Sequence, residues 1–326
     1  MNKKDIYEYD IVIIGGGISG CEASYISATK GAKVLMLSIN TDGIGSMAFG
    51  NYISIEKGIA ALGKDIWKRL VLNASARKTR IGINCIKNIN KESTSDILVV
   101  NRKRFRMTLK EIIESHKNIK IRQGLVVDID LKSNNYHTMT SDDTSYKSKA
   151  IILAPGTFLD SSIFWGSYNI EAGRPGEITS KRLLKNLIKK GFKFKETKLY
   201  SGAKIDGRSL ELEKYINNSE KQKLNIMPEG VETNEMYVDG LNDAKSEEVQ
   251  LKVLRKINGM KNIVMTRPGY GIKYNILSPL QINKDLESIK FPGLFFCGRI
   301  NGISEYESTA AQGYSAGLNA FKKIKK

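Results

Sequence analysis

Cysteine and histidine are scarce in this chain. Its 326 residues include three cysteines, Cys21, Cys85 and Cys297, and two histidines, His116 and His137. The cysteines are far apart and belong to no Cys-x-x-Cys or Cys/His spacing, so the sequence predicts neither a disulfide framework nor a zinc site. With two imidazoles and no Ser/His/Asp constellation, hydrolysis by a nucleophilic triad is not indicated either. We expect no bound metal.

Long apolar segments are missing as well. The sequence has no run of about 18 apolar residues, the length that a membrane-spanning helix needs. Its first residues, MNKKDIYEYD, lack the apolar core of a signal peptide. Hydrophobic residues make up 41% and charged residues 26% of the chain, proportions that fit a globular enzyme of one large domain or two ordinary ones. We expect a cytoplasmic protein without membrane contact.

Acidic side chains are outnumbered by basic ones. There are 52 Lys and Arg against 34 Asp and Glu, a formal net charge of +18. Such a surplus favours a polyanionic partner, because Lys and Arg neutralise phosphates and release counterions, and nucleic acid is the first candidate. The alternative is a Lys-, Ile- and Asn-rich composition inherited from an AT-rich genome, but that bias would add Glu along with Lys.

The densest basic patch is NRKRFR, residues 101–106. It places Arg102, Lys103, Arg104 and Arg106 around one aromatic ring, and clustered cations of this kind are typical of phosphate-binding surfaces. The alternative is the solvated start of a helix. We predict that these four side chains contact nucleic-acid phosphates.

The first organised unit is YDIVIIGGGISGCEASYISATKGAKVLMLSIN. The apolar runs Ile11–Ile14 and Val34–Leu37 predict two buried strands, with a glycine turn and a helix between them. In this βαβ setting GxGxxG has a mechanical meaning. Gly15 makes the tight turn, Gly17 lets the backbone approach a pyrophosphate at the helix N-terminus, and Gly20 lets the helix pack on the strand. The unit predicts dinucleotide binding.

The acidic residue that commonly holds a ribose diol at the end of the second strand is missing. Ser38 and Asn40 occupy that region and can hydrogen-bond a hydroxyl, although both also suit an ordinary strand end and turn. Cys21, just past the last glycine, is predicted to pack on the helix flank.

Later segments extend the sheet. IRQGLVVDIDL and SKAIILAPGTFLD predict one strand each, and GLFFCGRING predicts a strand that enters a glycine turn before a helix rich in small residues. The predicted fold is α/β: a two-dinucleotide-binding-domain type FAD-binding Rossmann-like domain, residues 1–160 and 265–326, with a smaller inserted α+β domain, residues 161–264. FAD would place its pyrophosphate at the first glycine turn, its adenine near Val126, and its flavin near Gly298–Glu307.

Five stretches carry a family resemblance. IIGGGISGCEAS, APGTFLDSSIFWGSYNIEAGRPGE, MPEGVETNEMYVDG, RPGYGIKYN and GLFFCGRINGISEYESTAAQGYSAGLNA, in this order, closely resemble the FAD-binding part of the MnmG (GidA) family. That family modifies the wobble uridine of certain tRNAs with FAD, NADH and methylene-tetrahydrofolate. The related TrmFO uridine methyltransferases share the glycine turns and the C-terminal helix, but match the middle stretches less well.

The resemblance implies a set of site residues. Lys57 with Gly58, Arg174, and Arg267 with Gly269 and Tyr270 match family positions, as do four residues on the flavin side. Together with the turns above, the predicted cofactor contacts are Gly15, Gly16, Gly17, Gly20, Ser38, Asn40, Val126, Gly156, Gly298, Asn301, Glu307 and Gln312. The candidates for a catalytic role beside the flavin are Lys57, Arg174, Glu305 and Phe49.

The chain also departs from the family. Phe49, within DGIGSMAFGN, stands where the family has a catalytic cysteine, and a phenyl ring cannot attack uridine. It could stack on a base or on the flavin, or simply fill the volume above it. Glu305 replaces a glycine, and would disfavour the anionic reduced flavin if it pointed inward; an outward position at the helix start is the alternative. Cys297 replaces a small residue, and packing at the strand end is favoured over a nucleophilic role.

Two family segments are reduced or missing. The segment with the second cysteine is shortened to LELEKYINNSEKQKLNI. This shortening removes most of the insertion that serves NADH in the family. We therefore expect weak NADH binding at most, and slow reduction of the bound flavin by NADH. The C-terminal helical region that contributes to tRNA and partner contacts in the family is absent, because the sequence stops at Lys326.

Two functions stay open. The first is an FAD-dependent enzyme that modifies a uridine or other pyrimidine in tRNA or rRNA without a cysteine adduct, by one-carbon transfer from methylene-tetrahydrofolate or by flavin reduction. The second is a non-catalytic FAD-binding RNA protein, or an accessory subunit of a full-length relative. RNA is the expected partner in both, and the chain could form a homodimer or a heterodimer with such a relative.

Overall fold

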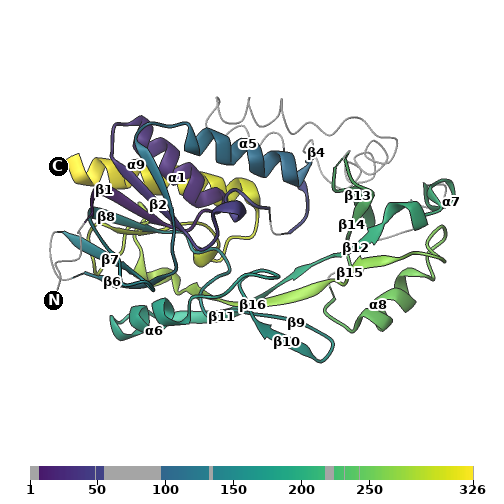
Figure 1. Ribbon diagram of the computed structural model, residues 1–326. Coiled ribbons are helices and arrows are strands. Elements are labelled where there is room, and N and C mark those ends of the chain that lie inside the picture. Colours follow the sequence, from purple (N-terminus) through teal and green to yellow (C-terminus); the bar gives the residue numbers. More distant parts are fainter. Residues whose placement is uncertain are drawn as a thin grey trace.

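The predicted α/β architecture with a mostly parallel sheet is confirmed. The structure, a computed structural model, describes residues 7–47, 49–54, 97–131, 135–216, 224–230, 232–241 and 243–325. A large sheet with helices on both faces lies at one end of an elongated molecule, and a small sheet with two short helices lies at the other (Figure 1). Lys57, Gly58 and Cys85 lie outside the described residues.

The large sheet has seven strands in the order β5-β2-β1-β8-β7-β6, with β17 beside β8. Strands β1, β2, β5, β8 and β17 pair in parallel, whereas β7 is antiparallel to both β6 and β8. Its strands are β1 (Tyr7–Ile14), β2 (Val34–Ser38), β5 (Ile119–Gln123), β6 (Val126–Asp130), β7 (Tyr136–Thr140), β8 (Ser145–Leu153) and β17 (Leu294–Phe296).

The apolar run of β1 is explained by its burial on both faces. Ile11 and Ile13 belong to one core cluster, and Val12 and Ile14 belong to another, because successive side chains of a strand point to opposite faces. Helices α1 (Ile18–Thr29), α5 (Arg102–Glu114) and α9 (Tyr306–Lys325) cover the first face, and α6 (Lys181–Lys189) covers the second (Figure 1).

Helices α1 and α9 approach each other closely through small residues. A Cβ on Gly313 would lie 2.2 Å from the carbonyl oxygen of Ser19, and one on Gly317 would lie 2.6 Å from that of Ala23. Ser27 Oγ also donates to the Gly317 carbonyl oxygen at 3.1 Å. This contact sets the N-terminal ends of both helices beside the same edge of the sheet.

The single strand predicted for IRQGLVVDIDL is wrong. The segment forms the two strands β5 and β6, which a break at Gly124 separates. β5 continues the parallel part of the sheet beside β2, whereas β6 pairs with β7 on the far side. The alternation of apolar residues continues through the break, so periodicity alone did not reveal that the chain crosses the sheet there.

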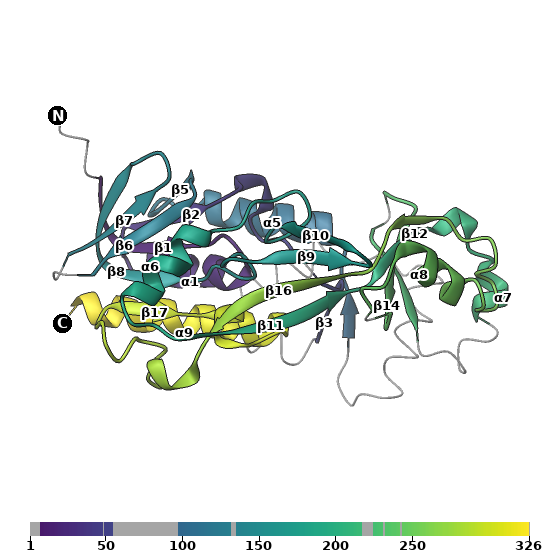
Figure 2. The ribbon, with the colours of Figure 1, turned by 90° about the horizontal axis from the view of Figure 1, so that it is seen from below.

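Two four-stranded antiparallel sheets and a two-stranded antiparallel sheet, formed by β3 and β4, are the other sheets of the described residues. The first, of order β10-β9-β16-β11, runs from the large sheet toward the second, of order β13-β14-β12-β15 (Figure 2). The elements are β3 (Tyr52–Ser54), β4 (Ile97–Val99), β9 (Ser162–Trp165), β10 (Tyr168–Glu171), β11 (Phe194–Ser201), β12 (Ala203–Asp206), α7 (Leu212–Ile216), β13 (Asn225–Pro228), β14 (Glu235–Asp239), α8 (Glu247–Leu254), β15 (Met265–Arg267) and β16 (Tyr270–Leu277), with short 3-10 turns at Thr41–Gly43 (η1), Gly207–Ser209 (η2), Pro279–Gln281 (η4) and Gly298–Asn301 (η5).

The proposed division into residues 1–160 with 265–326 and residues 161–264 stays a prediction. Strand β16 lies on the C-terminal side of residue 265, yet it pairs with β9 and β11 from the segment between. In the part of the chain that the structure describes, no helix has the length and apolar character needed to span a membrane.

Candidate functional site

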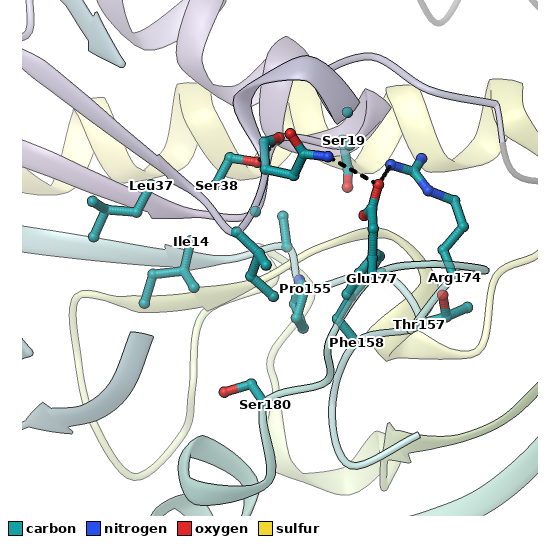
Figure 3. Close-up of a pocket in the computed structure, with 18 of the residues that line it drawn as sticks. Ile14, Ser19, Leu37, Ser38, Pro155, Thr157, Phe158, Arg174, Glu177 and Ser180 are labelled. Atoms are coloured by element: carbon teal, nitrogen blue, oxygen red, sulfur yellow. Dashed lines mark hydrogen bonds and ion pairs between the residues drawn. The ribbon is translucent and has the colours of Figure 1, made fainter. Parts of the chain in front are cut away.

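A pocket opens where the parallel strands β1, β2 and β8 end, the usual position of a ligand crevice in an open α/β sheet (Figure 3). It takes in about 1030 Å³ of space, part of which is open to solvent. Its lining includes Gly15–Ser19 from the β1–α1 turn, Leu37–Asn40 after β2, Gly124–Val126, Ala154–Phe158, Arg174, Glu177, Ser180, Arg299, Tyr306 and Thr309.

The glycines of the β1–α1 turn fall into two groups. Gly15 has φ +115°, and a Cβ there would lie 2.1 Å from the Ala154 carbonyl oxygen, while a Cβ on Gly20 would lie 1.9 Å from the Gly15 oxygen. Both are required by packing. A Cβ on Gly17 would meet no atom within 4 Å, so this residue leaves open space toward the pocket.

Helix α1 begins directly after Gly17, and no side chain caps its first turn. The first backbone N–H groups of a helix have no partner within the helix, and they bind anions together with the helix dipole. The turn therefore suits a pyrophosphate in the way that the spacing of the glycines predicts. Gly16 also lines the pocket, and a Cβ on it would lie 3.0 Å from Ser38 Oγ.

The end of β2 carries polar groups in place of the missing acid. Ser38 Oγ donates to the Asn40 carbonyl oxygen at 2.8 Å, and Asn40 Nδ2 donates to Glu177 Oε1 at 3.3 Å. Arg174 binds the same carboxylate oxygen at 2.5 Å (Figure 3). Sequence reasoning missed Glu177 as a pocket residue. A segment far from β2 in the sequence brings this carboxylate to the place where a ribose would lie.

Two further predicted contacts also line the pocket. Val126 is buried beneath Ser180, whose Oγ donates to the Val126 carbonyl oxygen at 2.7 Å. Gly156 follows β8 with φ +61°. The pocket thus brings together the predicted residues Gly15, Gly16, Gly17, Ser38, Asn40, Val126 and Gly156.

The predicted flavin-side residues shape the turn between β17 and α9. Gln312 Oε1 accepts from the Gly298 N–H at 2.9 Å and from Asn301 Nδ2 at 3.0 Å, and Asn301 Nδ2 also donates to the Phe296 carbonyl oxygen at 2.8 Å. Neither these residues nor Glu307 nor Gly20 is among those that line the pocket. Direct contact of these five residues with a cofactor stays a prediction. For Gly298, Asn301 and Gln312, the hydrogen bonds described above give a structural role in the turn.

Three residues at this end of the pocket were not named as contacts from the sequence, although two of them fall within the predicted flavin region Gly298–Glu307. Arg299, Tyr306 and Thr309 all line it, and Arg299 and Thr309 are only 8% and 7% exposed. Within the described residues, Arg299 Nη1 and Thr309 Oγ1 are buried without a hydrogen-bond partner. Burial raises the pKa of Tyr306 to about 12, although the charge of Arg299 works against that rise. Arg299 comes directly after the predicted glycine turn, and that position is the one signal that could have found it.

Phe49 is packed rather than free. It is 9% exposed and belongs to a cluster with Ile163, Tyr270, Ile272 and Tyr274. The Arg299 guanidinium carbon lies 4.8 Å from the centre of its ring. This packing favours the alternative that the Phe49 ring fills space in the protein core. Because the neighbouring Arg299 lines the pocket, the ring lies next to the pocket wall.

The other catalytic candidates are dispersed. Glu305 is exposed, and its carboxylate accepts from Ser308 Oγ at 3.0 Å at the start of α9, as the outward alternative predicts. Arg174 lies at the pocket wall, bound to Glu177. Cys21 and Cys297 are buried; desolvation raises the pKa of both thiols, that of Cys297 to about 12, so neither is a ready thiolate. The described residues contain no cluster of His, Cys, Asp and Glu suited to a metal.

The basic patch begins helix α5, and its members differ in availability. Arg102 Nε donates to Glu229 Oε2 at 2.6 Å, and its Nη2 binds the other carboxylate oxygen, with the two side chains 12% and 7% exposed. Arg104 pairs with Glu232 at the surface, and Arg106 donates to the Asp42 carbonyl oxygen. The Arg102 side chain is therefore held in a largely buried ion pair. Lys103, Arg104 and Arg106 remain predicted phosphate contacts.

Comparison with known proteins finds one family and a wider fold. A family model described as glucose inhibited division protein A matches residues 10–225 and 215–326. The tRNA uridine 5-carboxymethylaminomethyl modification enzyme MnmG of Caldicellulosiruptor saccharolyticus is 28% identical over 98% of this chain, and the chain spans 62% of that relative's length. The structure of Aquifex aeolicus GidA is 28% identical, with a TM-score of 0.85 over 97% of this chain and 63% of that one. Glycine oxidase of Geobacillus kaustophilus, 12% identical with a TM-score of 0.57 over 98% of this chain and 95% of that one, shares the fold.

Proposed function

Because this chain belongs to the glucose inhibited division protein A family, we propose that it is a flavoprotein that binds FAD and acts on uridine in tRNA. Its relatives are named as tRNA uridine modification enzymes, and the chain spans 62% of the length of one and 64% of another. The substrate and the activity are therefore extended to it from proteins that are longer than the chain described here.

The observation that carries the proposal is the extent of the pocket. It runs from the β1–α1 glycine turn, past the end of β2, to the start of α9. FAD is an elongated ligand with a nucleoside at one end, a pyrophosphate in the middle and a flavin at the other end. The pocket has the anion-binding start of α1 in its middle, the end of β2 on one side and the start of α9 on the other. This arrangement matches the order of groups in FAD.

The residues present fit FAD. The open space at Gly17 and the uncapped start of α1 would hold the pyrophosphate, and Ser38, Asn40 and Glu177 would hydrogen-bond the adenosine ribose. The buried Nη1 of Arg299 and Oγ1 of Thr309 have no partner in the described residues, and the polar edge of a flavin would satisfy both. Bound FAD would supply the redox and one-carbon chemistry, which the protein needs only to orient and to shield from water.

The chemistry that we propose does not use a cysteine adduct. Phe49 has no nucleophilic atom, and Cys21 and Cys297 are buried with raised pKa values. This leaves one-carbon transfer from methylene-tetrahydrofolate, or reduction of a pyrimidine, as the classes of reaction at the uridine. NADH as the electron donor is not part of the proposal, because the segment that serves it in the family is short here.

The buried cysteines also favour a second candidate function. A chain that binds FAD and RNA, and whose two described cysteines are buried, could act without turnover, as an accessory subunit of a full-length relative or as an RNA-binding flavoprotein. The two candidates differ in whether bound flavin is reoxidised by a substrate.

One experiment tests the proposal and separates the candidates. Nucleosides of tRNA and rRNA from a strain that lacks the gene are compared by mass spectrometry with those from strains that carry the wild-type chain or Gly17→Asp. We expect one uridine derivative to disappear on deletion and to return with the wild-type chain only. If the nucleosides are identical in all strains, the enzymatic function is wrong. If bound flavin in the purified protein is then also not reoxidised by methylene-tetrahydrofolate or tRNA, the accessory role is supported.

A further inference from the structure

We propose that Arg299 is the residue that stabilises the negative charge of the flavin ring when FAD is reduced. The inference rests on the proposed binding of FAD and goes beyond it, because it assigns the reactivity of the cofactor to one side chain. An arginine is always charged at physiological pH, so it acts as a permanent cation.

The first observation is that Arg299 is buried without a counterion. The side chain is 8% exposed, lines the pocket, and has a buried Nη1 without a partner among the described residues. No carboxylate of the described residues forms an ion pair with it, in contrast to Arg102 with Glu229 and Arg174 with Glu177. A buried charge without a partner is costly in a folded protein, so this arrangement calls for an anionic ligand.

The second observation is that the guanidinium is held in place by aromatic side chains. Its central carbon lies 4.8 Å from the ring centre of Phe49 and 5.8 Å from that of Tyr306. The Tyr274 hydroxyl of β16 also lies close to the cation: burial raises the pKa of that hydroxyl, and the charge of Arg299 works against the rise. The rings of Phe49 and Tyr306 fix the direction of the cation and provide no negative charge.

The third observation is the position of Arg299 along the pocket. In the large sheet, β1 and β8 separate β2 from β17. The proposed ribose-binding groups Ser38 and Asn40 lie at the end of β2, the start of α1 follows β1, and Arg299 follows β17. An extended FAD with its adenosine at β2 and its pyrophosphate at α1 therefore brings its flavin to Arg299.

The charge matters because of how a flavin takes up electrons. Two electrons and one proton add to the oxidised ring, the proton binds to N5, and a negative charge stays on N1 and O2. A cation close to that charge favours the reduced form, and charge near N1 is one of the ways in which proteins tune flavins. Sulfite tests the same property without an external reductant: its sulfur lone pair forms a bond to N5, and the electron pair displaced into the ring leaves the negative charge at N1 and O2.

The test uses sodium sulfite with the FAD-loaded protein. Arg299→Gln removes the charge and keeps hydrogen-bonding capacity, Arg299→Lys keeps the charge, and Arg122→Gln is the control. Arg122 is another guanidinium beside a tyrosine ring, 5.6 Å from the centre of Tyr146, but it is not among the residues that line the pocket. The affinity for sulfite is read from the loss of the visible flavin absorption, and the reduction potential is measured against a reference dye.

We expect Arg299→Gln to retain FAD and to bind sulfite at least about tenfold more weakly, with a potential lower by about 30 mV for each tenfold change in a two-electron couple. Arg299→Lys should lose less than the Gln variant, and Arg122→Gln should behave like the wild type. Wild-type protein should bind sulfite more tightly than free FAD does, a measurement that needs no variant.

Three results would overturn the inference. The first is wild-type sulfite affinity and potential in Arg299→Gln with FAD bound. The second is loss of FAD from a folded Arg299→Gln, which would assign the cation to the pyrophosphate. The third is a wild-type protein whose sulfite affinity is no higher than that of free FAD. A wild-type protein that does not bind FAD at all would instead remove the proposed function on which the inference rests.

Discussion

The hydroxyl of Tyr306 binds both backbone polar groups of Phe49. It accepts from the Phe49 N–H at 2.7 Å and donates to the Phe49 carbonyl oxygen, although 257 positions separate the two residues in the sequence. The first residue of α9 thereby fixes the loop that carries the ring. The cluster around Phe49 includes side chains from β9 and β16 of the sheet β10-β9-β16-β11. The contact between Tyr306 and Phe49 therefore connects α9 to that sheet.

Phe49→Ala should destabilise the protein, because it removes a buried ring from this cluster. Truncation of a buried phenylalanine typically costs about 3–5 kcal/mol. We expect the free energy of unfolding, measured in urea, to fall by roughly that amount, and RNA affinity of the folded protein to stay unchanged. Phe49→Leu, which keeps most of the volume, is the control and should lose much less. Loss of RNA binding with unchanged stability would instead assign the ring to base stacking, an interaction worth about 1–3 kcal/mol per base.

Gly17 and Gly20 should respond in opposite ways to substitution. Gly17→Asp places a carboxylate in open space at the start of α1, so FAD binding should be lost while the unfolding midpoint stays near that of the wild type. Gly20→Ala forces a Cβ to within 1.9 Å of the Gly15 oxygen, and we expect a loss of stability of about 1–3 kcal/mol. Circular dichroism melting and FAD titration measure both. A destabilised Gly17→Asp would show that this position serves packing rather than the ligand.

Arg102 and Lys103 are neighbours in sequence with different predicted roles. Arg102→Ala leaves Glu229, 7% exposed, without its bidentate partner, and breaking a buried ion pair costs about 3–5 kcal/mol. Lys103 is exposed, so Lys103→Ala should leave stability unchanged but reduce the slope of log affinity for RNA against log salt by about 0.7–0.9. An Arg102→Ala protein as stable as the wild type contradicts the structural role, and an unchanged salt slope in Lys103→Ala contradicts the phosphate contact.

Glu22 should make stability depend on pH. Burial raises the pKa of this carboxyl to about 8, and its Oε1 has no partner in the described residues. The unfolded chain releases the proton near pH 4.5, whereas the folded protein keeps it until about pH 8, so the contribution of this group is present at low pH and is lost as the pH rises between those values. The loss should reach a few kcal/mol.

The variant for this prediction is Glu22→Gln. Urea unfolding between pH 4.5 and pH 8 should show that Glu22→Gln gains stability relative to the wild type as the pH rises. Parallel curves for the wild type and Glu22→Gln would mean that this carboxyl is not neutral in the folded protein.

The local parts of the fold could be predicted from the sequence. The apolar run Ile11–Ile14 with the glycines after it gave β1, its turn and α1, because strand burial and turn geometry depend on neighbouring residues. The small residues of α9 marked a helix that permits close backbone approach, although the sequence did not name α1 as its partner. The break at Gly124 was not predicted, since the apolar alternation passes through it.

The candidate site was predicted in part, for a related reason. Gly17, Ser38 and Asn40 follow the first two strands directly, so the βαβ pattern places them at the pocket. Glu177 and Arg299 reach it from segments far along the chain, and only the packed sheet brings them beside Asn40 and Phe49. Arg102 was predicted as a phosphate contact together with its neighbours, and its ion pair with Glu229 could not be foreseen because 127 positions separate the two residues.

Equilibrium titration of the purified protein, freed of any bound flavin, with FAD, ADP and FMN tests the central claim most directly. A pocket that holds the adenosine at Ser38 and Asn40, the pyrophosphate at the start of α1 and the flavin at Arg299 should bind FAD most tightly, should bind ADP in competition with FAD, and should bind FMN poorly. The Gly17→Asp variant should bind none of the three. Absence of FAD binding, or FMN binding as tight as that of FAD, would contradict the account.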